Sequence, residues 1–265
     1  MSVIPLSAVD LGCAALLVVI LAAISYRLQL GLGQRMLLSG CRMTVQLLLI
    51  GLILRQLFDN FNIWLILVLS LVMVLVAGKE ITSRQNIKVA GFHGYGVGVF
   101  SMFISSFTLT FFSLYVIIEV EPWYAPQYAI PLLGMLLGNT MTGISLAVDR
   151  LTTDIYELRD VIEQRLYLGE EWQEACRDIR RTSMRTGMIP ILNSMAAAGV
   201  VSLPGTMTGQ ILGGTPPVEA VKYQILILFL IAAGTGFGVI SAIWLTSRNL
   251  FDSRHRLCLE KLEKE

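Results

Sequence analysis

The sequence has little charge for its length. Only 15% of its 265 residues are Asp, Glu, Lys or Arg, whereas 55% are hydrophobic. The charged residues cluster between long uncharged runs, and a soluble domain has no need of runs long enough to cross roughly 30 Å of hydrocarbon. This scarcity of charge excludes an ordinary soluble protein and indicates an integral membrane protein.

The net charge is small, and histidine and cysteine are few. Each of these features argues against a particular kind of binding site. The formal net charge is +1, so no overall positive field favours nucleic acid as a partner. The two histidines, His93 and His255, lack spaced partners, and we interpret both as surface residues. The four cysteines have no CxxC spacing, which argues against a zinc site and against a disulfide framework; they are Cys13, Cys41, Cys176 and Cys258.

The uncharged runs predict an all-α integral membrane protein with about seven transmembrane helices in a single domain, 1–265. No basic residue precedes the first run, so we expect a retained first helix rather than a signal peptide. A cytoplasmic helical excursion is expected at 149–185, between the fifth and sixth spans. The expected spans are 6–28, 36–57, 60–78, 96–118, 128–148, 186–210 and 221–247.

The positions of Lys and Arg predict the topology, because basic residues near span ends stay on the cytoplasmic side. With the N-terminus outside, 17 of the 20 basic residues fall in inner segments. Only Arg55 and Lys222 fall outside, and Arg42 lies within a span. We therefore expect a multi-pass protein with the N-terminus outside and the C-terminus inside.

The excursion carries apolar residues at helical spacing, which predicts two amphipathic helices separated at Gly169. No Gly or Pro lies between Asp149 and Leu168, so the first helix is expected to continue from the fifth span without a break. One interpretation is a coupling helix, which docks into a groove of a separate ATPase through Gly169, Trp172, Ala175 and Ile179. The alternative is a solvated hairpin that caps the bundle.

The sequence lacks a phosphate-binding loop of its own. Gly78-Lys79-Glu80 comes nearest, but it has neither the preceding glycine nor the following Ser or Thr. Carboxylates well inside the spans are missing too, which disfavours a carrier driven by H⁺ or Na⁺. We expect a non-enzymatic transporter subunit that binds no cofactor, with ATP and Mg²⁺ held by a partner ATPase.

Several motifs carry a family resemblance. The run 199–209, Gly-Val-Val-Ser-Leu-Pro-Gly-Thr-Met-Thr-Gly, is the most specific, and Leu168-Gly169, Ile189-Pro190 and 220–224 agree with it in order. With these motifs the chain resembles the bacterial FetB-type ABC transporter permeases, proposed iron exporters. Further matching positions are Arg42, Gln46 and Gly51, Ile130-Pro131, Gly134-Met135, Gly138-Asn139 and Ser253-Arg254-His255.

The resemblance implies a homodimeric permease in the bacterial cytoplasmic (inner) membrane that works with two copies of an ATP-binding cassette ATPase. It implies export of iron, with a role in metal homeostasis and oxidative stress. Plant relatives in this broad family are tied to aluminium tolerance and nucleotide-sugar export. Export of a nucleotide sugar or another polar solute therefore stays open, as does a gradient-driven transporter.

Polar residues inside the expected spans are candidates for the substrate pathway. Arg42 and Gln46 lie one turn apart in the second span, where Arg42 either snorkels to the inner surface or contacts substrate. Asn139 follows a Gly134/Gly138 pair that suggests close helix packing, so its amide is a helix–helix contact or a ligand.

The sixth span holds the strongest pathway candidates. Pro204 removes a helical hydrogen bond, and we expect it to free backbone carbonyls toward a cavity. The alternative is a structural kink before the next loop. The sequence assigns no metal ligands, and the pathway residues predicted here are Asn193, Ser202, Pro204, Thr206, Met207 and Thr208.

Overall fold

The computed structural model describes residues 7–59, 62–252 and 254–264. These residues form two compact units. The first unit holds the residues up to Asn62 together with Gln210–Thr215, and the second holds Ile63–Gly209 and the residues from Pro216 onward. The side chain of His93 lies outside what the structure describes, as do Leu6 at the start of the first expected span and Ser253.

Two helices, α1 (Ala8–Arg27) and α2 (Gly33–Asp59), make up most of the first unit. A capping box starts α1: the Ser7 hydroxyl accepts the Asp10 N–H, and the Asp10 carboxylate accepts the Ser7 N–H at 2.8 Å. The two helices approach closely at Gly33, where a Cβ atom would lie 2.9 Å from the Ala22 carbonyl oxygen.

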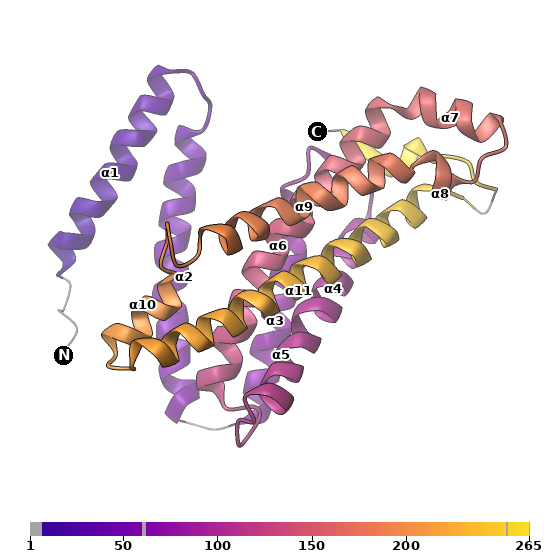
Figure 1. Ribbon diagram of the computed structural model, residues 1–265. Helices are drawn as coiled ribbons and strands as arrows, with labels where there is room; N and C mark the ends of the chain where they lie inside the picture. Colours follow the sequence, from indigo (N-terminus) through magenta and orange to yellow (C-terminus); the bar gives the residue numbers. More distant parts are fainter. Residues whose placement is uncertain (1–6, 60–61, 253, 265) are drawn as a thin grey trace. The chain divides into compact units, whose positions relative to one another are not determined.

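The second unit is a bundle in which α6 and α11 pack on each other and on α9 (Figure 1). Two π-helical turns, η1 and η2, interrupt its fourth span, and two short strands add a small antiparallel sheet that an all-α interpretation does not include. Its elements are α3 (Ile63–Ser83), β1 (Ile87–Val89), α4 (Phe92–Met102), η1 (Phe103–Phe107), α5 (Thr108–Phe112), η2 (Ser113–Ile117), α6 (Pro126–Glu157), α7 (Arg159–Tyr167), α8 (Trp172–Ala175), α9 (Arg177–Ala197), α11 (Pro217–Leu250), η3 (Leu259–Lys261) and β2 (Leu262–Lys264), with α10 (Gly205–Leu212) running from this unit into the first.

Six helical stretches of the described chain are long and apolar enough to cross a membrane: 8–27, 33–57, 63–83, 94–117, 126–157 and 217–250. They coincide with the first five and the last of the predicted spans, so the protein is an all-α, multi-pass membrane protein as predicted. The segment predicted as the sixth span is divided, because α9 ends at Ala197 and α10 begins at Gly205. Helix length alone therefore does not establish a seventh crossing.

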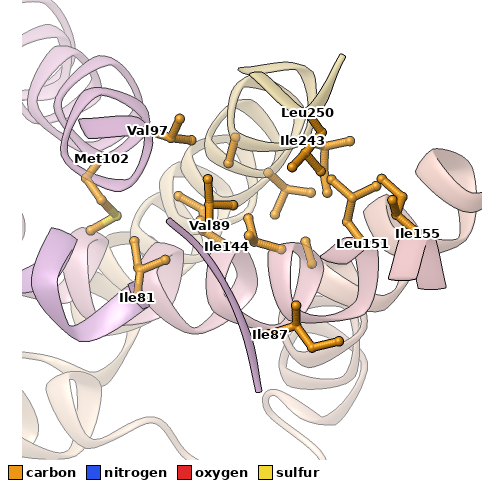
Figure 2. Close-up of a cluster of buried hydrophobic side chains, with 14 of the residues drawn as sticks. Ile81, Ile87, Val89, Val97, Met102, Ile144, Leu151, Ile155, Ile243 and Leu250 are labelled. Atoms are coloured by element: carbon orange, nitrogen blue, oxygen red, sulfur yellow. The ribbon is translucent and has the colours of Figure 1, made fainter. Parts of the chain in front are cut away.

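A continuous hydrophobic core joins the bundle to the excursion. Figure 2 shows labelled side chains of β1, α4, α6 and α11 directed toward one another, among them Val89, Ile144 and Leu250. The same cluster extends through Leu151 and Ile155 to Ile162 on α7. Motion of the excursion is thus linked to the bundle by buried contacts.

Close helix packing occurs at glycines other than the pair predicted. A Cβ atom on Gly187 of α9 would lie 2.6 Å from the Gly143 carbonyl oxygen of α6, so only glycine permits this crossing. Gly134 faces the Met73 side chain, and Gly138 has no atom within 4 Å of an added Cβ. The predicted Gly134/Gly138 contact is therefore wrong for Gly138.

The expected unbroken helix from the fifth span to Leu168 is also wrong. The α-helix ends at Glu157, and α7 starts two residues later, after Leu158 adopts a non-helical φ/ψ of −99°/17°. Gly169 does form the predicted turn, with φ of +91°, a conformation that favours glycine. The second predicted helix of the excursion begins with the short α8 and continues as α9.

Candidate functional site

Three segments far apart in the sequence meet at one end of the second unit, in what we call the platform. They are β1, the excursion segment from α7 through α8 to Cys176, and the tail residues 251–252 and 254–264. Strand β1 pairs with β2, with Ile87 opposite Lys264 and Val89 opposite Leu262. The loop before β1 is tied to α6, because the Asn86 N–H donates to the Asp149 carboxylate at 2.7 Å. Charge distribution had assigned these segments to one side of the membrane, and the fold places them together (Figure 1).

The residues predicted to contact an ATPase are packed against the chain itself. Trp172 stacks on Phe251 with ring centroids 5.4 Å apart, and the Arg180 guanidinium lies 5.5 Å from the Trp172 ring centre. Ala175 is buried, and Ile179 is half-buried against the core cluster. These side chains hold the excursion onto the bundle rather than point outward.

His255 takes part in the same packing and is only half exposed. Its Nδ1 accepts a hydrogen bond from the Trp172 backbone N–H at 3.4 Å, and its φ of +58° turns the tail toward α8. The interpretation of His255 as a plain surface residue is therefore incomplete.

The most exposed large apolar side chains of the excursion lie at its tip, immediately before Gly169. Tyr167 is 86% exposed and Leu168 is 84% exposed. The sequence analysis did not single out this exposed pair, because it searched for apolar residues at helical spacing. The available signal was their position, out of phase with the buried Ile162 stripe and next to the turn glycine.

Two titratable groups of the platform have shifted pKa values. Burial raises the pKa of the Cys176 thiol from 9.0 to about 12, although Arg180 and Arg165 oppose the shift. The Arg256 backbone N–H, donated to the Asp252 carboxylate at 2.8 Å, holds the pKa of that carboxyl below its usual range. Cys176 is thus a neutral packing residue, and Asp252 closes the turn that leads into the tail.

The second candidate region is the break between α9 and α10. Gly199 has φ of +83°, and the Ala197 carbonyl accepts the N–H groups of Val201 at 3.0 Å and Ser202 at 3.1 Å. Pro204 follows this turn instead of kinking a continuous helix, and its carbonyl accepts the Thr208 N–H at 3.1 Å. The turn and the start of α10 thus use the Ala197 and Pro204 carbonyls, and that Pro204 frees other carbonyls toward a pathway stays a prediction.

The side chains around the break have different environments. The Thr206 hydroxyl donates to the side-chain carbonyl of Gln224, a buried residue of α11. Met207 is half-buried, whereas Ser202 and Thr208 are exposed. Thr206 therefore ties the start of α10 to α11, a role that sequence reasoning did not foresee.

The remaining predicted pathway residues lie on three helices, α2, α6 and α9. Asn139 donates its amide to the Met135 carbonyl of its own helix at 2.8 Å, and Asn193 is exposed on α9. Arg42 and Gln46 are exposed on α2, which belongs to the first unit. Within the described residues, no group of three or more His, Cys, Asp or Glu side chains could hold a metal ion.

Comparison with known proteins decides the family. The model of UPF0014, an uncharacterised protein family, matches residues 8–251. The chain belongs to the UPF0014 family. This UPF0014 protein is 36% identical to a UPF0014 membrane protein of Synechocystis, over 86% of this chain and 87% of the relative.

Two further relatives of the UPF0014 protein have more specific names. It is 31% identical to the probable iron export permease protein FetB of Escherichia coli, over 97% of this chain and 96% of that protein, which confirms the predicted resemblance. It is 33% identical to the protein ALUMINUM SENSITIVE 3 of Arabidopsis thaliana, over 92% of this chain and 88% of the relative. No solved structure matches the chain.

Proposed function

We propose that this protein is the membrane-spanning permease subunit of an ABC transporter that exports iron or a related metal ion. The observation that carries the proposal is the exposed Tyr167-Leu168 pair at the tip of the excursion. Two adjacent large apolar side chains exposed beyond the end of a span form a small patch of the kind that a protein contact buries, and this supports a docking role. A separate ATPase, which holds ATP and Mg²⁺, is the partner that a permease without nucleotide motifs requires.

The inner face of the excursion explains how such a contact can reach the bundle. Trp172, Ala175 and Ile179 pack on the core cluster that also holds Ile144 and Leu151. Force applied at Leu168 is then transmitted through packed side chains instead of being lost in a flexible loop. In this revised coupling role, the residues first predicted as ATPase contacts fasten the hairpin, and Tyr167 and Leu168 meet the ATPase.

The platform also supports seven crossings. Helix α9 leaves the platform, and α11 returns to it, where Phe251 stacks on Trp172. A chain that leaves one end and returns there crosses an even number of times in between, so the broken segment 186–210 counts as a crossing. Seven crossings leave the termini on opposite sides of the membrane. The positions of the basic residues favour a C-terminus on the cytoplasmic side of the bacterial cytoplasmic membrane.

The substrate proposal rests on the name of the FetB relative. Oxygen donors suit hard cations such as ferric iron, and Ser202, Thr208 and Asn193 supply exposed oxygens in the broken segment. One chain has one set of spans, whereas an ABC transporter needs two, so the working unit is a homodimer. The ALUMINUM SENSITIVE 3 relative keeps aluminium and polar solutes among the substrates to be tested.

The contact with the ATPase is tested in proteoliposomes that hold the permease and its cognate ATPase. The double substitution Tyr167→Ser with Leu168→Ser is expected to lower ATP-dependent export at least tenfold while leaving the permease folded. The control is Gln164→Ala, an exposed polar change one turn earlier on α7, which is expected to keep export. Unchanged export in the double variant contradicts the docking role of this pair.

The substrate and the energy source are tested in the same vesicles. Iron, aluminium, other metal ions and nucleotide sugars are supplied in turn, and ATP hydrolysis and flux are measured. Iron is expected to stimulate both. If iron stimulates neither ATP hydrolysis nor flux while another solute does, iron is not the substrate, but the permease role stands. Flux driven by an ion gradient without the ATPase contradicts the ABC assignment.

A further inference from the structure

A cavity of about 380 Å³ opens where α11 meets the platform. Two of its lining residues carry positive charge, and none of the described residues that line it is acidic. The lining residues are Val89, Ala90, Arg248, Asn249, Phe251 and Lys261.

The two cations of the cavity are held in different ways. The Lys261 ammonium donates to the Asn249 carbonyl at 2.7 Å, near the end of α11, which fixes its charge at the cavity wall. The exposed Arg248 guanidinium lies 5.4 Å from the ring centre of Trp244. Among the described residues, no carboxylate forms an ion pair with Arg248 or Lys261. Their charge is therefore available to an anion from outside the chain.

The position of the cavity indicates the source of that anion. Helix α11 is one of the stretches long and apolar enough to cross a membrane, and Arg248 and Asn249 lie in its last turn. Trp244 is 45% exposed one turn earlier. An exposed tryptophan next to an arginine at the end of a span is typical of the membrane–water interface, at the depth of lipid phosphates. Basic pockets at this depth suit anionic headgroups.

We propose that this cavity binds the headgroup phosphate of an anionic phospholipid, with Arg248 and Lys261 as its positive partners. The acyl chains extend along the apolar surface of α11 beside Trp244. Inorganic phosphate offers the same chemistry without acyl chains, so it is the competitor to be compared. The proposal does not depend on what the protein transports.

The test is native mass spectrometry of the full chain in detergent, titrated with phosphatidylglycerol, phosphatidylcholine or inorganic phosphate. Phosphatidylglycerol is expected to bind in preference to phosphatidylcholine. Arg248→Gln is expected to weaken phosphatidylglycerol binding about fivefold, the effect of one basic residue near an anionic membrane surface. The matched control is Arg254→Gln, an exposed cation of the same tail that does not line the cavity, and it is expected to leave binding unchanged.

Three outcomes overturn the proposal. Equal weakening by Arg248→Gln and Arg254→Gln reduces the effect to general surface charge. Displacement of phosphatidylglycerol by equimolar inorganic phosphate makes the site one for free anions. If Arg248→Gln does not fold, the test rests on lipid binding by the unsubstituted protein. Equal binding of phosphatidylglycerol and phosphatidylcholine by that protein contradicts the proposed site.

Discussion

Trp172 illustrates how a single side chain acquires its role from its neighbours. An aromatic residue on a polar helix suggests an outward contact, yet this indole lies between Phe251 and Arg180 of its own chain. The stacking covers the ring, and the His255 imidazole accepts the backbone N–H. At the scale of the residue, the excursion is packed onto its own chain through Trp172, and its most exposed large apolar side chains are Tyr167 and Leu168.

Cys176 allows a prediction at the same scale. Its thiol is fully buried, and its pKa is raised to about 12. At pH 8, a maleimide is therefore expected to leave Cys176 unmodified in the folded protein and to modify it after denaturation. The measurement uses a chain that keeps Cys176 as its only cysteine. A chain that keeps only the partly exposed Cys258 is the control, and it is expected to react when folded.

The pH dependence follows with a definite sign. Below pH 9.0 the Cys176 thiol is neutral in both the folded and the unfolded chain, so it does not alter stability. Between about 9 and about 12 only the unfolded thiol ionises, so the free energy of unfolding is expected to fall as the pH rises. Reaction of folded Cys176 at the rate of Cys258 would contradict the buried environment.

At the scale of the element, the crossing of α6, α9 and α11 depends on the absence of side chains. Gly143 and Gly187 face each other, and a Cβ on Gly187 would also lie 3.0 Å from the Val239 side chain of α11. Three helices thus approach at one level of the bundle. Helix α9 ends ten residues after this crossing, and Val200 and Val201 in the break that follows are exposed.

Substitution at this crossing is predicted to destabilise the bundle. Gly187→Ala forces a methyl group against backbone and is expected to cost about 1–3 kcal/mol, as overpacking of a core does. The control Gly138→Ala adds the same methyl group where nothing lies within 4 Å, and it is expected to be neutral or slightly stabilising. The comparison is the melting temperature of each purified variant in detergent. Equal melting temperatures would show that the crossing is not tight.

At the scale of the whole molecule, the platform brings the beginning, the middle and the end of the second unit into contact. The tail pairs with β1, and the same tail stacks on α8, so segments separated by more than 150 residues meet at one end. In the proposed topology, the chain returns to the same side after each pair of crossings. In the proposed assembly, the platform is the face on which the ATPase docks.

This architecture predicts the topology of the protein in the cell membrane. Green fluorescent protein fused after Glu265 is expected to fluoresce, because it folds inside the cell. Alkaline phosphatase inserted at Gly214, between α10 and α11, is expected to be active, because that loop lies outside after the sixth crossing. Alkaline phosphatase inserted at the exposed Gly169 turn of the excursion is expected to be inactive, and activity at both Gly169 and Gly214 would show that the segment 186–210 does not cross the membrane.

Several properties follow from the sequence by itself. The long uncharged runs determine that the candidate spans are helical, because a bilayer requires the backbone groups of a spanning segment to be hydrogen-bonded within the segment itself. The asymmetry of Lys and Arg predicts the orientation, and motifs such as 199–209 carried the family assignment, confirmed by the family match over 8–251. Gly169 also follows from the sequence, because the turn needs a positive φ.

Tertiary structure alone decided which faces of these elements are used. Three examples are the packing of Trp172 on Phe251, the close approach of Gly143 and Gly187, and the Thr206–Gln224 hydrogen bond. Each depends on residues that are distant in the sequence, so the local periodicity of the sequence cannot predict it. Tertiary structure likewise decided where the few charged residues of the chain lie relative to one another. Their scarcity identified a membrane protein, and the fold decided that Arg248 and Lys261 share one cavity.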